Sequence, residues 1–274
     1  MLTEAQLDRV EIVLVSPRNP LNIGAAARAM ANFGFSRLSV AAPYAPHWRE
    51  ARSAVGAPKL LQNAVECANL AEAVANCTLV AGTGTLTYRK PEQPVVSLPD
   101  LAPLAARELA RGGRIALVFG PEKHGLTRED LSWCQILVEI PTDARQPSMN
   151  LGQAVAVCLY ELATRAFAAE DSPPPLRRAP TFPRPFAERV GDASPSSASE
   201  SAPAAASGRL ELLASLIEET MTAAGYSPAA MRPANHHDLR LLLRRLAPSE
   251  PDTRRILGLF RRILWRIQRD RHRQ

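Results

Sequence analysis

Short apolar runs alternate with longer amphipathic stretches over the first 170 residues. Val10–Pro17 is rich in β-branched residues and predicts a buried strand, and similar runs predict strands at Ser36–Ala42, Thr78–Gly82, Arg114–Phe119 and Ile136–Ile140. Helical spacing and helix-ending glycines predict helices at Asn22–Phe33, Leu70–Ala75, Leu101–Ala110, after Thr127 and at Leu151–Ala168. Strands that alternate with helices form a mostly parallel sheet covered on both faces. The pattern therefore predicts an α/β domain over residues 1–170.

The pattern changes after this domain. Residues 171–208 hold many prolines and a serine- and alanine-rich stretch, which predicts a linker. Three further helices are predicted at Leu210–Ala224, at His237–Leu246 with Asn235 or His236 as the N-cap, and from about Asp252 to Arg269. The last helix has an apolar face formed by Ile256, Leu259, Phe260, Ile263, Leu264 and Ile267. We therefore expect a small all-α extension over residues 209–274.

Composition narrows the class of protein. No run reaches 18 uncharged apolar residues, and the N-terminus lacks the basic start and apolar stretch of a secretion signal. The cysteines form no CxxC pair and sit in mixed apolar surroundings, so they are expected to be reduced and partly buried: Cys67, Cys77, Cys134 and Cys158. The five histidines do not join them at zinc-ligand spacing. We expect a cytoplasmic protein with no membrane contact and no metal.

The positive charge is concentrated at one end of the chain. Residues 1–170 carry 16 basic and 16 acidic side chains, and residues 171–208 carry four of each. Residues 209–274 carry 13 arginines against 7 acids, which accounts for the whole net charge of +6. The planar guanidinium fork suits phosphate, so this segment predicts a polyanionic partner. A solvated helix face or a dimer contact is the alternative interpretation.

The candidate chemistry lies in turns that follow the predicted strands. A typical dinucleotide site would place a glycine-rich turn after the first strand, but Ser16–Gly24 holds a single glycine. Glycine-bearing turns follow later strands instead, at Gly82-Thr-Gly84 and Gly120–Gly125. If the sheet is parallel, these turns and the Gln146–Met149 loop share its carboxyl edge, where open α/β sheets bind ligands.

Three separated segments carry a family resemblance. Asn22-Ile-Gly-Ala-Ala-Ala-Arg28, Phe119-Gly-Pro-Glu122 and Ser148-Met-Asn150 resemble the motifs of the SpoU/TrmH branch of the SPOUT RNA methyltransferases. Within that branch the chain is most similar to the TrmJ family, which methylates the ribose 2′-OH of tRNA nucleotide 32. The resemblance covers about residues 9–168 and continues weakly through the predicted helical extension. It implies a SPOUT-type sheet with a C-terminal trefoil knot, bound S-adenosylmethionine, tRNA as partner and a homodimer.

The resemblance also implies roles for five polar residues. Arg28 is assigned to the reacting ribose; with a pKa above about 12 it cannot take a proton, so it would hold a phosphate or stabilise the forming alkoxide. Its alternative is a surface helix arginine. Asn22 would orient the ribose or the arginine, or act as an N-cap. Glu122 would anchor RNA or a backbone amide, or act as a structural cap. Ser148 would bond the target ribose region, and Asn150 would close its loop on the cofactor or cap the next helix.

Family position further assigns the cofactor and RNA contacts. The cofactor would be held largely by backbone at Gly82, Thr83, Gly84, Gly120, Ile140, Pro147, Ser148 and Met149. RNA contacts are expected at Arg89, although it is shifted from the family position, and at Arg254, Arg255, Arg261 and Arg262. Two alternatives stay open: the same chemistry on ribosomal RNA or another tRNA position, and a non-catalytic SPOUT-like RNA-binding protein.

Overall fold

A computed structural model describes residues 2–44, 47–51, 53–84, 91–165, 203–226 and 228–271. Seven strands form one sheet in the order β3-β2-β1-β6-β4-β7-β5, and each pairing between them is parallel. In chain order the strands are β1 (Val10–Val15), β2 (Arg37–Ala41), β3 (Val65–Cys67), β4 (Leu79–Thr83), β5 (Val95–Ser97), β6 (Ile115–Phe119) and β7 (Ile136–Glu139). The predicted parallel α/β domain is confirmed.

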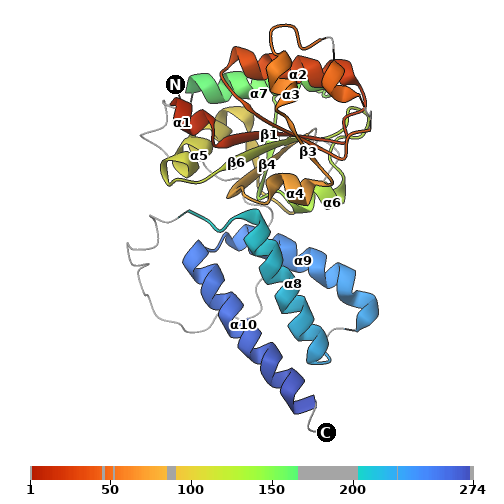
Figure 1. Cartoon of the computed structure of the whole chain (residues 1–274), viewed down its shortest axis with the longest axis vertical. Coiled ribbons are helices and arrows are strands. Elements are labelled where there is room, and N and C mark those ends of the chain that lie inside the picture. Colours follow the sequence, from red (N-terminus) through yellow and green to blue (C-terminus); the bar gives the residue numbers. More distant parts are fainter. Residues whose placement is uncertain are drawn as a thin grey trace.

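Helices cover both faces of the sheet, and each face has its own apolar core (Figure 1). The larger core joins β1 and β6 to α2 (Pro20–Asn32), α5 (Leu98–Ala110) and α7 (Leu151–Arg165). The smaller core lies under α4 (Leu70–Val74) and α6 (Arg128–Ser132). The remaining short elements of this part are α1 (Glu4–Leu7), η1 (Trp48–Glu50) and α3 (Pro58–Gln62).

Two glycines let backbone segments approach α2 closely. A Cβ on Gly152 of α7 would lie 2.7 Å from the Cβ of Ala25, and a Cβ on Gly24 would lie 2.2 Å from Ser53 Oγ. Ser53 Oγ in turn donates a hydrogen bond to the carbonyl of Leu21 at 2.7 Å. The first turns of α2 are therefore clamped between α7 and the Ser53 segment, which fixes the helix that carries the first motif.

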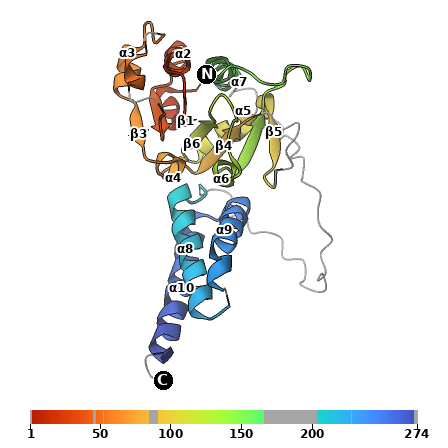
Figure 2. The same ribbon diagram turned by 90° about the vertical axis from the view of Figure 1, so that its right-hand side faces the viewer.

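The C-terminal residues form a layer of three helices beneath α4 and α6 (Figure 2). Its elements are α8 (Ser207–Ala223), η2 (Ala229–Met231), α9 (Arg232–Leu246) and α10 (Glu250–Arg271). α8 lies between α9 and α10 and shares a small core with them, formed by Leu213, Ala214, Leu243 and Leu257 (Figure 1). Its first turn is tied to the α/β domain, since the backbone N–H of Ser207 donates to the Cys77 carbonyl at 2.8 Å.

Several sequence-based expectations need correction in this layer. The N-cap of α9 is Met231, so Asn235 and His236 lie inside the helix. On α10, Leu257 is buried, whereas Leu259 and Ile263 of the predicted apolar face are 56% and 39% exposed. α8 starts at Ser207, inside the predicted linker, and most of that linker lies outside the described residues.

The buried thiols match the prediction from sequence. All four cysteines are free and buried. Burial, reinforced by the charge of Glu11, raises the pKa of the Cys77 thiol to about 12, and burial also raises that of Cys134 to about 12. None of the helices in the described part of the chain is both long and apolar enough to cross a membrane.

Candidate functional site

The first motif begins at a sharp turn after β1. Ser16 has a left-handed backbone, with φ of 44°, and its N–H donates to the Ala41 carbonyl at the end of β2. The side chain of Asn19 then caps α2 by accepting from the backbone N–H of Leu21 at 3.0 Å, and Pro20 occupies the first helical position. The alternative interpretation of Asn22 as the N-cap is therefore wrong. Asn22 lies in the first turn with its side chain available for other contacts.

The second motif closes over this turn through Glu122. One carboxylate oxygen accepts from Asn22 Nδ2 at 2.9 Å and from the N–H of Asn19 at 3.2 Å, and the other accepts from the N–H of Arg18 at 3.1 Å. Partial burial raises the pKa of Glu122, but the hydrogen bonds from Asn22 and the backbone amides outweigh it, so the pKa lies below its ordinary value. The predicted contact of Glu122 with backbone amides is confirmed, and the group is a carboxylate at neutral pH.

The third motif joins the same group through Asn150. Its Oδ1 accepts from the backbone N–H of Gly152 at 2.9 Å and so caps α7, as one of the two interpretations predicted. Its Nδ2 donates to Asn22 Oδ1 at 3.0 Å. Since Asn22 accepts from Asn150 and donates to Glu122, the orientation of its amide is fixed from both sides. We call this hydrogen-bonded series of Glu122, Asn22 and Asn150 the motif chain, because it links the three segments that the sequence singled out.

A cavity of about 600 Å³ lies beside the motif chain at the carboxyl ends of β4, β6 and β7. This is the edge at which the sequence predicted a ligand site. Seven of the eight predicted cofactor residues line it: Thr83, Gly84, Gly120, Ile140, Pro147, Ser148 and Met149. The sequence missed other lining side chains, among them Phe119, Lys123, His124, Glu139, Thr142 and Leu151. A cavity of this volume can enclose a nucleoside-sized ligand.

Backbone geometry shapes this cavity. A Cβ on Gly120 would lie 2.3 Å from the carbonyl carbon of Gly125, so only glycine allows the loop to fold back on itself. A Cβ on Gly84 would have no atom within 4 Å and would face open space, so the main chain of Gly84 is accessible. The Thr83 hydroxyl is held by the neighbouring strand, since Oγ1 donates to the Val118 carbonyl at 3.0 Å.

Gly82 is the predicted cofactor residue that the cavity does not include. A Cβ at this position would meet Cys134 Sγ at 2.6 Å and Leu126 Cδ1 at 3.1 Å. The structure therefore gives Gly82 a packing role between β4 and the core under α6. Its contact with a cofactor stays a prediction.

Arg28 stands apart from the motif chain. It lies six residues after Asn22 on α2, which places it about 9 Å further along the helix axis and on a different side. Its side chain is exposed and does not line the cavity, whereas Ser148 does. Within one copy of the chain, the structure thus brings together four of the five predicted catalytic residues and leaves Arg28 outside.

The structure describes four of the five arginines that are predicted to contact RNA. Arg89 lies outside the described residues. Arg254, Arg255, Arg261 and Arg262 are all exposed on α10. Arg254 is 3.8 Å from the half-buried Glu250, and Arg255 is 3.5 Å from the exposed Asp252. Ion pairs this open to solvent contribute little stability.

Two further arginines of the C-terminal segment are buried, which the sequence did not predict. Arg240 donates to both oxygens of Glu211, at 2.9 and 3.0 Å, and to Glu129 and Ser132 of α6. Arg244, whose side chain is 1% exposed, donates to the Trp133 carbonyl at 3.2 Å and to Ser207 Oγ at 3.0 Å. Their guanidinium carbons lie 4.2 and 4.7 Å from the centre of the Trp133 ring. These two arginines hold the helical layer against the α/β domain.

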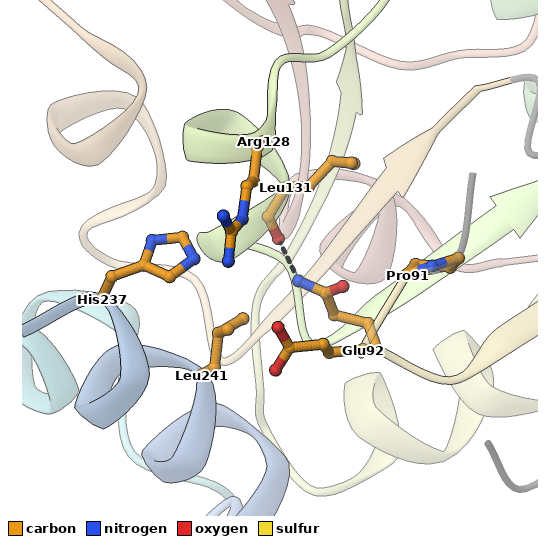
Figure 3. Close-up of a pocket in the computed structure, with 7 residues that line it drawn as sticks. Pro91, Glu92, Arg128, Leu131, His237 and Leu241 are labelled. Atoms are coloured by element: carbon orange, nitrogen blue, oxygen red, sulfur yellow. Dashed lines mark hydrogen bonds between the residues drawn. The ribbon is translucent and has the colours of Figure 1, made fainter. Parts of the chain in front are cut away.

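A second, smaller cavity of about 280 Å³ adjoins this contact (Figure 3). It lies between α6, α9 and the segment before β5, and Leu131 and Leu241 supply apolar walls while Arg128, His237 and Glu92 supply charged or polar ends. Gln93 Nε2 donates to the Leu131 carbonyl at 2.7 Å and ties the segment to α6. No motif in the sequence indicated this cavity. In the described part of the chain, no three His, Cys, Asp or Glu side chains gather as a metal site.

Comparison with known proteins identifies the relatives of this chain. The SpoU rRNA Methylase family matches residues 9–160. The tRNA (cytidine/uridine/adenosine-2′-O-)-methyltransferase TrmJ of Pseudomonas aeruginosa is 39% identical over 173 residues, which cover 63% of this chain and 67% of that protein. The tRNA (cytidine-2′-O-)-methyltransferase TrmJ of Methanocaldococcus jannaschii is 36% identical over 159 residues, covering 57% of this chain and 68% of that protein.

A solved structure extends the likeness to the helical layer. The crystal structure of TrmJ from Z. mobilis ZM4 superposes with a TM-score of 0.72 at 27% sequence identity, covering 92% of this chain and 98% of that one. The family match spans the three motifs, the motif chain and the lining of the larger cavity. The chain therefore belongs to the SpoU methylase family.

Proposed function

We propose that this protein is an S-adenosylmethionine-dependent tRNA ribose 2′-O-methyltransferase that acts at nucleotide 32 of the anticodon loop. The observation that carries the proposal is the motif chain, which joins three distant segments at the rim of one cavity at the sheet's carboxyl edge. Family membership and the tRNA 2′-O-methyltransferase names of the relatives support the reaction and the substrate.

The larger cavity suits S-adenosylmethionine. Gly84, Gly120 and Met149 offer main-chain groups and small surfaces to a flat, neutral adenine, and Ile140 and Leu151 offer apolar walls. Glu139 and Glu122 also line the cavity, and their acidic groups suit a ligand that carries a positive sulfonium. S-adenosylmethionine would supply a methyl group on an already activated carbon, so the protein contributes chiefly by alignment and by excluding water.

The motif chain and Ser148 would position the ribose. Asn22 is held rigidly between Glu122 and Asn150, so its surroundings are preorganised before RNA binds. Ser148 is exposed at the cavity wall, where its hydroxyl can bond to the ribose. Arg28 would hold the phosphate beside the target and stabilise negative charge on the 2′ oxygen, and a phosphate oxygen or water would take the proton.

The position of Arg28 supports a homodimer. Its helix also exposes Leu21, which is 56% accessible, and the neighbouring α7 exposes Tyr160 at 52% and Val157 at 37%. Apolar side chains exposed on adjacent helices are typical of an interface. We propose that two copies pair through α2 and α7, so that Arg28 of one copy serves the cavity of the other.

Mixing two inactive variants tests this arrangement. Arg28→Ala keeps an intact cavity, and Gly120→Ala keeps an intact arginine. If Arg28 acts across the interface, mixed dimers regain one working site, and an equal mixture recovers about a quarter of the wild-type activity. An arginine that serves its own cavity would give no recovery, and a monomer in sedimentation analysis would refute the pairing.

Methylation of purified tRNA tests the function itself. The full chain with tRNA and methyl-labelled S-adenosylmethionine should transfer label to a ribose 2′ oxygen, and digestion with mass spectrometry should place it at nucleotide 32. Arg28→Ala should lower the rate by about a hundredfold or more while calorimetry shows unchanged cofactor binding. Ribosomal RNA is a necessary control, because the matching family is described as an rRNA methylase family. Label in ribosomal RNA but not in tRNA would favour that alternative substrate. Absence of cofactor binding by the wild-type chain would favour the non-catalytic alternative.

Three further features belong to this proposal. We propose the trefoil knot of the SPOUT family around β7 and α7, cytoplasmic placement beside the tRNA pool, and the division into residues 1–170, 171–208 and 209–274. Buried, free thiols support a reducing compartment. Limited proteolysis that cleaves first within residues 171–202 would support the division.

A further inference from the structure

One tryptophan of this protein is exposed on the surface. The sequence has three, and Trp48 and Trp133 are 0% and 8% exposed, whereas Trp265 is 57% exposed. Trp265 lies in the last two turns of α10, which extend past the ends of α8 and α9 in both views (Figures 1 and 2). The helix packs on α8 through Leu257, and Leu264 is also buried, but Trp265 takes no part in that core. Packing of α10 against its neighbours therefore does not explain why a large aromatic side chain is at this position.

The surroundings of Trp265 are strongly basic. Arg261 and Arg262 precede it by one helical turn, and Arg269 follows it by one turn. The guanidinium carbon of Arg269 lies 5.2 Å from the centre of the tryptophan ring. Arg254 and Arg255 continue the exposed basic surface toward the start of the helix. We call these five arginines together with Trp265 the α10 basic face.

The side of α10 that carries Trp265 is also open two turns earlier along the helix. Gly258 lies two turns before Trp265 on nearly the same side of the helix, and a Cβ there would have no atom within 4 Å. A glycine inside an exposed helix costs about 1 kcal/mol relative to alanine, so helix stability does not favour it. Nothing in the described structure covers α10 at Gly258, on the side that carries Trp265.

We propose that Trp265 is a stacking platform for an unpaired base of the RNA substrate, while the arginines of the α10 basic face contact the flanking phosphates. The inference rests on the proposed function for its substrate class and adds a base contact that the arginines alone do not provide. Arginine forks fit phosphate oxygens, and an aromatic ring set among them is the arrangement with which proteins bind single-stranded nucleic acid. A stacked base needs no particular hydrogen bonds, so the platform should select unpaired RNA over paired RNA with little preference for sequence.

Intrinsic fluorescence tests this directly, because the other two tryptophans are buried. Adding tRNA, or an unpaired RNA oligonucleotide, to the full chain should quench the emission of Trp265 at the concentrations at which anisotropy shows binding. The quenching should be absent from Trp265→Phe, which keeps a ring for stacking. Trp265→Ala should weaken binding of unpaired RNA about tenfold and leave binding of a fully paired duplex nearly unchanged.

Leu259→Ala is the matched control, since Leu259 is 56% exposed on the same helix but lies on a different side. It should change neither quenching nor affinity. RNA binding without quenching, or equal losses for paired and unpaired RNA in Trp265→Ala, would overturn the proposal. A change of oligomeric state in Trp265→Ala with unchanged RNA affinity would also overturn it, because the face would then be a protein contact. Since quenching needs no methyl transfer, this outcome is separate from failure of the proposed activity.

Discussion

The α/β domain and the helical layer use charged side chains in opposite ways. In the α/β domain the one charged member of the motif chain, Glu122, accepts hydrogen bonds from groups that fix its position beside the cavity. In the helical layer two arginines of α9, Arg240 and Arg244, are buried against Trp133, whereas the α10 arginines between positions 254 and 269 are exposed. The first region fixes its charged group within a hydrogen-bond network, whereas α10 leaves its positive charges open to solvent.

This difference changes how the positive charge of the C-terminal segment is interpreted. Its 13 arginines look equivalent in the sequence, but Glu211 and Glu129 already neutralise part of the charge on α9. Burial raises the pKa of Glu211, yet hydrogen bonds from Arg240 and His236 outweigh it and hold that pKa below its ordinary value. The carboxylate thus stays charged beneath the two arginines. Arg240 and Arg244 are thus engaged within the protein, so under the proposed function only the exposed arginines are available to RNA.

The largest effect is expected where a buried arginine is removed. Arg244→Ala should lower the free energy of unfolding by about 2–4 kcal/mol, because it leaves the buried Trp133 carbonyl and Ser207 hydroxyl without their hydrogen-bond partner. Arg262→Ala, on exposed α10, should change it by less than about 0.5 kcal/mol. Urea unfolding of both variants measures the contrast. Similar losses for the two would erase the distinction between buried and exposed arginines.

The next effect concerns the cavity loop. Gly120→Ala should cost about 2 kcal/mol of stability and abolish cofactor binding, since the new methyl group would overlap the backbone of Gly125 and Leu126. Calorimetric titration with S-adenosylmethionine and thermal unfolding provide the two readings. Cofactor binding at wild-type affinity would show that the loop does not shape the site.

A smaller effect is expected at the charged end of the motif chain. Glu122→Gln should lower methylation about tenfold to a hundredfold with a modest loss of stability, because an amide cannot accept from Asn22 and from both backbone N–H groups. The pKa of Glu122 is lower in the folded protein than its ordinary value of 4.5. Its stabilising contribution is therefore present at neutral pH and is lost as the pH falls below about 4.5, through the folded-state pKa. The stability difference between wild type and variant should shrink in that range, and a difference that persists unchanged would exclude the carboxylate as its source.

The smallest effect is a gain. Gly258→Ala should raise the free energy of unfolding by about 0.5–1 kcal/mol, because alanine favours the helix and its methyl group meets open space. The comparison with Gly120→Ala separates a glycine required by close packing from one that is not. A loss of stability in Gly258→Ala would mean that this side of α10 is covered.

The alternating pattern of the first 170 residues was sufficient to predict most of the α/β domain. Long apolar strands such as β1 and β6 are unmistakable because both of their faces are buried. β3 and β5 escaped prediction because each is a three-residue edge strand with a single buried side chain. The start of α9 was misplaced because its N-cap, Met231, makes no side-chain capping bond, so the sequence carries no local signal there.

The candidate site was predictable where motifs meet a sheet edge. Asn22, Glu122 and Asn150 were identified by resemblance, but the bonds between them required a fold that brings together residues 100 and 128 positions apart. The six-residue spacing on one helix already separates Arg28 from Asn22, but its absence from the cavity wall depends on where the strand-end loops lie, which the sequence does not show. Likewise, nothing in the local sequence distinguishes Arg244 from Arg262. Their difference arises from Glu211, which the packing of α8 on α9 brings close, and from Trp133, which the contact with the α/β domain brings close.

The salt dependence of tRNA binding tests the division of roles most directly. A variant with Arg254, Arg255, Arg261 and Arg262 changed to glutamine should be compared with wild type, after equal urea unfolding has shown that both are folded. The slope of log affinity against log salt should fall by about three, because fewer counterions are released, while kcat at saturating tRNA stays unchanged. An unchanged slope, or a lost kcat at saturation, would contradict the account.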